Sequence, residues 1–519
     1  MAPTVLSAPS EAIPPRASAR DWMAVAAGAI GSFMATLDIS IVNSALPTIQ
    51  GEIGASASEG TWIATAYLVA EIIVIPLTGW LERVFGLRRF LLIAAALFTA
   101  FSILCGVATD LPTMIIGRIG QGFTGGAMIP TAMTIIATRL PRSQQPIGTA
   151  MFGATVILGP VLGPLIGGWL TETFSWHYAF FLNIPVCLGL MVLLLVGLPS
   201  ERPNLGALRD ADWLGIAGMV LGLGGFTVVL EEGHREHWFE SSLIWQLSGL
   251  TLLGFILVGI GQLKSKRPVI RLGLLRQRQF ASVIVMALAT GVVLYGASYV
   301  IPQFLAAIAG YNALQAGQIV FLSGVPAILA MPFLPLMMKH LDVRVAIGGG
   351  FMLMAVATWM NNGLTAEAVG GDFVTSQLML GFGQIMAMIF LNQAAISAVD
   401  PKDAGDASGL FNAARNLGGS IGLAVLATIR DERTEQHRWN IHSAIEHNDV
   451  GVQDYLSGLA DQFGGMEAAY RMLDATVTQQ AVVMTFNDCF SLIAVVIVAS
   501  AALVFFLKPL PKGGAMVMH

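Results

Sequence analysis

Long apolar runs separated by short polar breaks are the main pattern along this chain of 519 residues. A helix that crosses the hydrocarbon core of a bilayer needs about 20 mostly apolar residues. Fourteen runs approach or exceed that length: 22–46, 60–81, 90–108, 112–136, 146–170, 178–198, 213–231, 243–262, 280–303, 315–338, 344–363, 372–397, 405–430 and 483–507. The pattern predicts an all-α membrane protein with fourteen transmembrane helices.

Composition agrees with a location in the lipid bilayer. Hydrophobic residues make up 55% of the chain and charged residues 11%, whereas soluble domains carry about 25% charged residues. The formal net charge is −5 and no basic domain is present, so we expect no binding to nucleic acid. The first 20 residues are polar and proline-rich and lack a signal-peptide core, so we expect the first apolar run to be retained as a span.

The loops differ strongly in their content of Lys and Arg. If the N-terminus is cytoplasmic, 20 of the 27 Lys and Arg residues fall in cytoplasmic segments and 5 in outer segments. Cytoplasmic loops of membrane proteins carry the excess of these residues. We therefore expect both termini in the cytoplasm, as tails of residues 1–21 and 508–519.

Two outer segments depart from the short loops found elsewhere. Residues 231–242 form an acidic, aromatic turn, in which an acidic vestibule is a better interpretation than a metal site. Residues 431–482 are too polar to span and too long for a simple connection. Within them, Val450–Phe463 and Gly465–Gln480 have apolar residues three or four apart and read as amphipathic helices. We expect this segment to project from the outer face.

Markers in the first six runs recur in the same order in the last six. The pairs are Gly79–Arg89 with Met338–Arg344, and Gly117–Gly122 with Leu380–Gln384. Weak internal symmetry of this kind is typical of transporters built from repeats. The predicted organisation is a six-helix half at 22–198, two inserted helices and a linker at 199–279, and a six-helix half at 280–507.

Ionisable side chains inside the runs are the candidate functional residues. Each costs about 2.5–3.5 kcal/mol on insertion scales, and such residues commonly mark ion or substrate pathways. Asp38, Glu71 and Arg118 lie within the first, second and fourth runs. Asn412, Arg415 and Asn416 share one helical face of the thirteenth run. A structural ion pair or packing between helices is the alternative interpretation for each group.

The fifth run is unusually rich in Gly and Pro. Its residues Gly159, Gly163, Pro164, Gly167 and Gly168 resemble the antiporter motif of drug-exporting major facilitator proteins. Leu37–Pro47, Arg118–Gly122 and Gly409–Gly419 resemble motifs of the fourteen-span drug:proton antiporters. Trp238–Ser241 and the segment 431–482 resemble the EmrB branch. Together these motifs cover the whole chain.

The resemblance implies a major facilitator fold with six, two and six helices in a bacterial inner membrane. It implies export of small hydrophobic or amphipathic compounds by alternating access, driven by a proton gradient without a cofactor or metal. The family motifs place Asp38 and Arg118 near a central cavity, where Asp38 would carry the proton. They do not demand a carboxylate at Glu71, which we expect from its position to be a second proton site or to attract cationic substrates. A substrate cavity would involve Asn43 and Gln121 with Asn412, Arg415 and Asn416. A periplasmic adaptor and an outer-membrane channel would be the protein partners.

One loop departs from the family pattern. Gly79, Leu81 and Gly86 match the motif that follows the second span, but Arg83 occupies the position of its Asp, and Glu82 precedes it. The usual contact across the cytoplasmic gate is therefore in doubt.

Other functions stay open on the sequence alone. The nearest alternative is an exporter dedicated to one metabolite, lipid or siderophore. A receptor or a membrane enzyme is disfavoured, because Asp38, Glu71 and Arg118 would then have no proton to move and no cluster of nucleophile, base and metal ligands is evident. We expect no enzyme activity.

Overall fold

The computed structural model describes residues 16–141, 143–208, 211–265, 268–330, 333–400, 403–445 and 450–507. These residues form helices and connecting turns without a β-strand among them. Residues 1–15 and 508–519, which make up most of the two predicted tails, lie outside the described part. Helical structure occupies the described residues of all fourteen predicted runs.

The N-terminal half and the inserted pair contain eleven of the larger elements. They are α1 (Ala19–Glu52), α2 (Ala57–Gly60), α3 (Trp62–Phe85), α4 (Leu87–Gly106), α5 (Leu111–Arg139), α6 (Gln145–Thr173), α7 (His177–Phe181), α8 (Asn183–Gly197), α9 (Trp213–Met219), α10 (Gly225–Gly233) and α11 (Ser242–Lys264). A five-residue π-helix, η2 (Val220–Gly224), joins α9 to α10.

The C-terminal half contains the remaining larger helices. They are α12 (Arg278–Ala307), α13 (Ala313–Phe321), α14 (Val325–Ala330), α15 (Leu334–His340), α16 (Val343–Met360), α17 (Val374–Ser397), α18 (Ala404–Ala444), α19 (Val450–Phe463) and α20 (Met466–Ala501). Short 3-10 turns connect several of them, among them η3 (Trp238–Glu240) before α11 and η4 (Leu272–Arg276) before α12.

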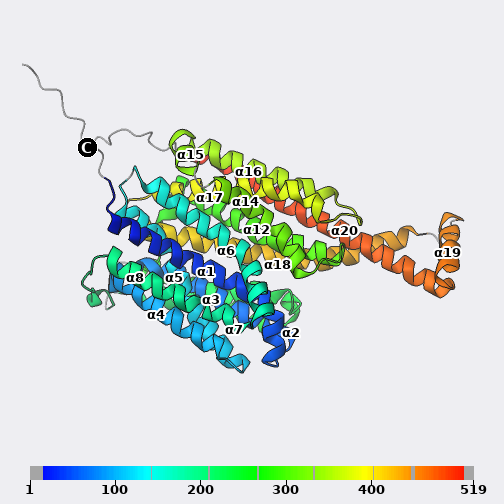
Figure 1. Ribbon diagram of the computed structural model, residues 1–519, viewed down its shortest axis with the longest axis horizontal. Helices are drawn as coiled ribbons and strands as arrows, with labels where there is room; N and C mark the ends of the chain where they lie inside the picture. The colour runs from blue at the N-terminus through cyan, green and yellow to red at the C-terminus, as the bar shows by residue number, and fades with distance from the viewer. Residues whose placement is uncertain are drawn as a thin grey trace, which may run out of the picture.

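The two halves repeat the same packing. In the first half α1 lies against α6 and α4 against α5, and in the second half α12 lies against α18 and α16 against α17. Figure 1 shows the halves side by side, with the earlier helices in blue and cyan and the later ones in green to red. They meet where α18 packs on α3 and α5, and where α6 packs on α13, α15 and α17.

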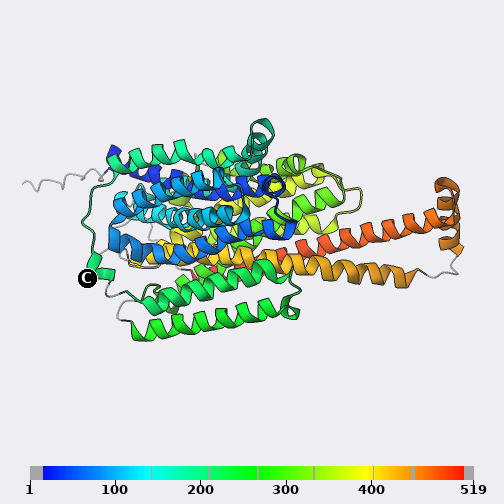
Figure 2. The same ribbon diagram turned by 90° about the horizontal axis from the view of Figure 1, so that it is seen from below.

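Helices α9, α10 and α11 form a layer outside the two halves, visible below the bundle in Figure 2. Within this layer α11 packs on α9 and α10, and Gly254 meets the backbone of Gly222 without room for a side chain. Only 17% of the most apolar stretch of α11 is buried inside the protein, as expected for a helix that faces lipid. By contrast, α10 packs inward on α3 and α18.

Ten of the described helices are long and apolar enough to cross a membrane, and eleven if bent α6 counts as one span. The predicted runs that miss this threshold are those of α5, of α18 and of the segment broken into α13, α14 and α15. The first two carry the buried polar side chains Arg118, Gln121, Asn412, Arg415 and Asn416, which lower their hydropathy. The polar groups of the candidate site therefore account for part of the difference from fourteen.

Residues 431–482 do not form a loop with two separate helices. Instead α18 runs on to Ala444, α20 begins at Met466, and α19 lies between them. Figures 1 and 2 show α18 and α20 extending together beyond the bundle with α19 at the end. The predicted helix at Val450–Phe463 has its expected bounds, whereas Gly465–Gln480 is the first part of the last long helix. We call residues 431–482 the helical projection.

Candidate functional site

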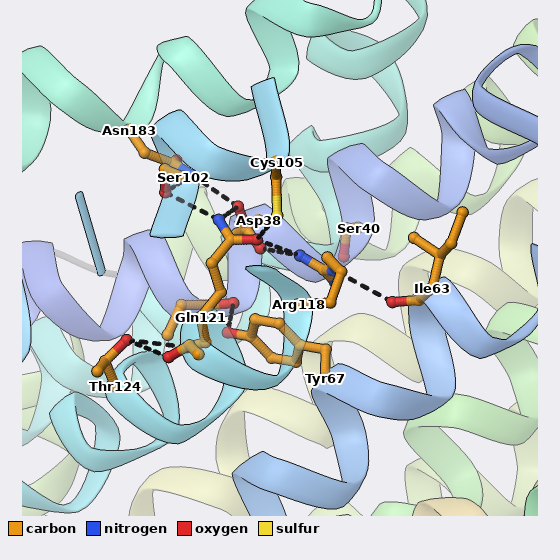
Figure 3. A network of polar contacts seen from close by, with 12 residues as sticks. Asp38, Ser40, Ile63, Tyr67, Ser102, Cys105, Arg118, Gln121, Thr124 and Asn183 are labelled. Atoms are coloured by element: carbon orange, nitrogen blue, oxygen red, sulfur yellow. Dashed lines mark hydrogen bonds and ion pairs between the residues drawn. The ribbon is translucent and has the colours of Figure 1, made fainter. Parts of the chain in front are cut away.

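Asp38 and Arg118 form an ion pair in the interior of the N-terminal half. Arg118 Nη1 lies 2.6 Å from Asp38 Oδ2, and both side chains are completely buried. Asp38 comes from α1 and Arg118 from α5, so the pair joins helices distant in sequence (Figure 3). A buried charge is tolerated when it is paired and hydrogen-bonded, and both conditions hold here.

Amide and hydroxyl groups complete the surroundings of the Asp38 carboxylate. Asn183 Nδ2 donates to Asp38 Oδ1 at 2.6 Å and Gln121 Nε2 donates to the same oxygen at 3.1 Å. Both amides also donate to the hydroxyl of Ser102, at 3.1 Å and 2.8 Å. The carboxylate is therefore held by a network of groups from α4, α5 and α8, as drawn in Figure 3.

The guanidinium of Arg118 is fixed from three sides. Its Nε donates to the carbonyl of Ile63 at 3.0 Å, and its Nη1 donates to Gln121 Oε1 at 3.0 Å. The Cζ atom lies 4.3 Å from the centre of the Tyr67 ring, a cation–π distance. The remaining nitrogen, Nη2, is buried without a hydrogen-bond partner. We call Asp38, Arg118, Gln121, Asn183, Ser102 and Tyr67 the first polar centre.

Three members of this centre, Asn183, Ser102 and Tyr67, are not among the residues expected from the sequence. Asn183 is the single polar side chain of its apolar run apart from the terminal Tyr178, Ser102 shares its run with Thr99, and both Asn183 and Ser102 are completely buried. An isolated amide in a membrane helix commonly hydrogen-bonds across to another helix, so Asn183 carried a usable signal. Gln121, expected along a substrate cavity, lies instead within this closed network.

The glycines of the antiporter motif bring α6 into contact with α1. A Cβ atom at Gly159, Gly163 or Gly167 would overlap atoms of α1. The α1 residues concerned are Thr36, Ser40 and Ser44 in turn. Both sets recur every four residues, so the two helices present matching rows of small side chains. Asp38 lies two residues from both Thr36 and Ser40, which is about half a helical turn. The helix α6 therefore packs on the side of α1 opposite to the first polar centre.

The other two motif residues, Pro164 and Gly168, do not take part in this close approach. A Cβ at Gly168 would have no atom within 4 Å, and Pro164 Cβ lies 3.9 Å from the position that a Cβ atom on Gly317 of α13 would take. The axis of α6 bends by 44° between Gln145–Pro160 and Leu162–Thr173. Prolines remove backbone donors and favour such bends, so α6 reaches from α1 to the C-terminal half.

A second group of buried polar residues lies where α3 meets α18. Arg415 is 2% exposed and Asn412 is completely buried. Arg415 Nη2 donates to Asn416 Oδ1 at 3.2 Å, while its Nε and Nη1 have no hydrogen-bond partner. Glu71 is 2% exposed, packs against Gly126 and lines a small cavity together with Asn416. We call Glu71, Arg415, Asn412 and Asn416 the second polar centre.

The inner of two adjoining cavities reaches this second centre. An inner cavity of about 20 Å³ is lined by Glu71, Tyr295, Asn416 and other residues. An outer cavity of about 310 Å³ is lined by residues of α1, α3, α10, α12 and α18. Asn43, expected along a cavity, is exposed on α1 and lines neither of them.

An ion-pair cluster joins the halves near the predicted cytoplasmic end. Arg83 Nη1 lies 3.3 Å from Asp406 Oδ1, and Arg271 Nε lies 3.4 Å from Asp406 Oδ2. Arg271 also pairs with Asp403. Arg83 thus makes the contact between α3 and α18 with a basic side chain where the family motif has an acid, and Glu82 Oε1 is buried without a partner.

Comparison with known proteins identifies the family. The model of the Major Facilitator Superfamily matches residues 28–423. The chain is 30% identical over 491 residues to the colistin resistance protein EmrB of Acinetobacter baumannii, covering 94% of this chain and 96% of the relative. It is 29% identical to the multidrug export protein EmrB of Escherichia coli K12, with 92% and 94% covered. The fatty acid resistance protein FarB of Neisseria gonorrhoeae is 27% identical, with 96% and 97% covered.

A solved structure shares the arrangement of helices. The human organic anion transporter MFSD10 superimposes with a TM-score of 0.60 at 14% identity, covering 93% of this chain and 99% of that one. At this identity the likeness shows the fold alone. The sequence comparisons show that the molecule is a membrane transporter rather than an enzyme. The chain belongs to the Major Facilitator Superfamily and, within it, to the EmrB-type exporters.

Proposed function

We propose that the protein is a proton-coupled exporter of amphipathic compounds that works by alternating access. The observation that carries this proposal is the Asp38–Arg118 ion pair, sealed inside the N-terminal half at 2.6 Å. A proton gradient would supply the energy, and the protein would need no cofactor.

Protonation of Asp38 would change the first polar centre in a defined way. A neutral carboxyl no longer balances Arg118, which would leave a buried cation without its partner. The helices that supply the surrounding polar groups, α4, α5 and α8, would then favour a different packing around α1. Because α6 lies directly behind Asp38 and reaches the C-terminal half, that change would pass to the contact between the halves.

The names of the relatives support a broad range of amphipathic substrates. They refer to colistin, to multiple drugs and to fatty acids. The outer cavity of about 310 Å³ is at the lower end of ligand-binding cavities, about 300–1,000 Å³. The fatty acid resistance protein favours a second candidate, an exporter dedicated to one lipid-like compound, and a transport screen of the purified protein would separate the two.

The proposal includes fourteen spans, both termini in the cytoplasm and a location in the bacterial inner membrane. The 20-to-5 distribution of Lys and Arg supports this orientation. The helical projection would then extend from the outer face into the periplasm.

Uptake of ethidium, a fluorescent amphipathic cation, into inverted membrane vesicles tests the proposal, because inversion turns export into uptake. An imposed pH gradient should drive ethidium transport, and collapsing the gradient with an ionophore should stop it. Transport that continues at full rate without a gradient, or that requires ATP, would reject proton coupling.

We also propose that the projection docks a periplasmic adaptor, which in turn meets an outer-membrane channel. Apolar side chains support this idea, because Val450, Tyr455 and Phe463 of α19 are 71%, 48% and 45% exposed. Exposed apolar residues gathered on one element commonly mark a protein interface.

Deletion of residues 440–475 tests the adaptor proposal. The deletion is feasible because α18 and α20 run together here, with Arg438 of α18 and Asp474 of α20 paired at 3.0 Å, so a short Gly–Ser linker can join the cut helices. Substrate binding and vesicle transport should persist, while resistance of whole cells should be lost. Unchanged whole-cell resistance would exclude docking at this projection.

A further inference from the structure

Glu231 lies near the end of α10, on the inserted pair rather than on either half. It lines both the inner and the outer cavity, together with Ser420 and Leu423. Of these three residues only Glu231 can exchange a proton near neutral pH. The outer cavity carries further polar residues of the predicted periplasmic side, among them Glu232 and His234. Glu231 therefore stands between that cavity and the interior of the protein.

Two neighbours of Glu231 form ion pairs, whereas the polar neighbour of Glu231 itself is the neutral hydroxyl of Ser420. Glu232 Oε2 lies 2.6 Å from Arg235 Nη2, and His234 Nε2 lies 3.0 Å from Asp431 Oδ2. Within the described residues Glu231 forms no ion pair, and its Oε1 atom is enclosed without a hydrogen-bond partner. An enclosed carboxylate oxygen without a donor is costly in a protein interior and often has a functional reason.

The inner cavity separates Glu231 from Glu71. Its volume of about 20 Å³ exceeds the roughly 10–15 Å³ needed for one water molecule. Tyr295, Asn416 and Ser420 supply polar groups around the same space, so a water there would find several hydrogen-bonding partners. One water is enough to connect two carboxyl groups across a cavity of this size.

Glu71 in turn lies close to the first polar centre. Tyr67 is one helical turn before it on α3, and the Tyr67 ring faces Arg118 at 4.3 Å. Glu231 and Glu71 thus line the inner cavity, Tyr67 lies one turn from Glu71, and Arg118 beside Tyr67 pairs with Asp38.

We infer that Glu231 is the entry point for protons from the outer side and that it passes them to Glu71. A hydronium ion in the outer cavity transfers a proton to the Glu231 carboxylate and becomes water. Glu231 then releases a proton to the water of the inner cavity, which passes one of its own to Glu71, and Glu231 returns to the carboxylate form. The inference rests on the proposed proton coupling, and it gives the inserted helices a direct part in transport.

Several charged or titratable groups surround Glu231, and each packed element contributes to them. On α10 and the turn after it these groups are Glu232, His234 and Arg235. The helices packed against it contribute Glu71 from α3, Tyr295 and Tyr299 from α12, and Arg415 from α18. Glu232 and His234 are held in ion pairs at the outer cavity. The two carboxyl groups that line the inner cavity are those of Glu231 and Glu71.

The test compares Glu231→Gln with the native chain in proteoliposomes that contain the full-length protein. Two measurements are made with ethidium: transport driven by an imposed pH gradient, and exchange of labelled for unlabelled ethidium without a gradient. Gradient-driven transport should fall about a hundredfold, the lower end of what a positioned acid–base group contributes. Exchange should be unchanged, because it requires no net proton movement. Glu240→Gln, an exposed acid of the same outer turn, serves as the matched control.

A second variant keeps the test decisive if the glutamine variant folds poorly. Glu231→Asp retains a carboxyl group and should recover most gradient-driven transport, with a shifted dependence on outer pH. Full gradient-driven transport by Glu231→Gln, an equal loss in both assays, or an inactive Glu231→Asp that binds ethidium normally would overturn the inference. Absence of gradient-driven transport in the native chain would instead reject the proposed function itself.

Discussion

Two arginines are buried in the interior among the residues that the structure describes, and their surroundings differ in a way that separates the two halves. Arg118 is in the N-terminal half, pairs with Asp38 at 2.6 Å and is held by Ile63, Gln121 and Tyr67. Arg415 is in the C-terminal half, reaches Asn416 at 3.2 Å and leaves two nitrogens without partners. The first centre is closed, whereas the second lies beside cavities that reach the outer side.

The difference indicates a division of roles between the centres. A closed network built around an ion pair resists change until a proton neutralises one partner, which suits an energy-coupling site. A buried arginine with spare donors, whose neighbours Glu71 and Asn416 line a cavity, suits a site that receives a ligand or a water. Four changes test this division, taken here from the largest expected effect to the smallest.

Removal of the Asp38 charge should have the largest effect. Asp38→Asn keeps the shape of the side chain and leaves Arg118 without a counter-charge. We expect gradient-driven ethidium transport to fall at least about a hundredfold, while the purified variant still elutes as a folded protein. Asp461→Asn, an exposed acid of α19, is the control, and full transport by Asp38→Asn would remove Asp38 from the coupling step.

Disruption of the contact behind Asp38 should come next. Gly163→Leu would force α6 away from Ser40 and should lower the free energy of unfolding by about 1–3 kcal/mol, as overpacking does. Gly168→Leu, on the same helix with open space at its Cβ, should change stability by less than about 0.5 kcal/mol. Thermal unfolding in detergent measures both variants, and equal midpoints would contradict the close packing of α1 on α6.

Matched lysine substitutions compare the two arginines directly. Arg118→Lys keeps a charge near Asp38 but loses the planar group that bonds Ile63 and Gln121, and should cost about 1–3 kcal/mol. Arg415→Lys removes mostly unpartnered nitrogens and should cost less. Thermal unfolding of the two variants tests the contrast, and a larger loss for Arg415→Lys would reverse our description of the centres.

The cytoplasmic ion pairs should give the smallest effect. The side chain of Arg83 is 45% exposed, and a pair at such a site contributes about 0.2–1 kcal/mol. Arg83→Ala should therefore alter the transport rate only a few-fold, by weakening the contact with Asp406. Arg89→Ala, at an exposed position in the first turn of the next helix, α4, should have no effect. A complete loss of transport by Arg83→Ala would contradict the small effect expected for this contact.

The two charged residues of the first polar centre, Asp38 and Arg118, were predicted from the sequence. Asp38 and Arg118 stand out because ionisable residues are rare in apolar runs, and the family motifs place them together. Asn183, Ser102 and Tyr67 complete the centre across three other helices, and no spacing along the chain reveals such contacts. The glycine motif was recognisable as a row, but its partners Thr36, Ser40 and Ser44 emerge only when α1 and α6 are packed.

Other features depended on where helices end and turn. Glu231 was placed in an outer acidic turn, because the apolar run ends there, yet the inward packing of α10 brings it to the inner cavity. The segment 431–482 was expected to contain two separate helices, and its polarity concealed that α18 and α20 simply continue. The onset of polar residues marks where a span stops, but it does not show whether the helix continues beyond the membrane.

The central claim is that movement of substrate and movement of protons are linked, and reversal of the cycle tests it most directly. Proteoliposomes loaded with ethidium, with equal pH on both sides and a pH-sensitive dye inside, are diluted into ethidium-free buffer. The account predicts that outflow of ethidium drives protons inward in the native chain and that Asp38→Asn abolishes this proton movement. Outflow of ethidium with no change in internal pH in the native chain would contradict it.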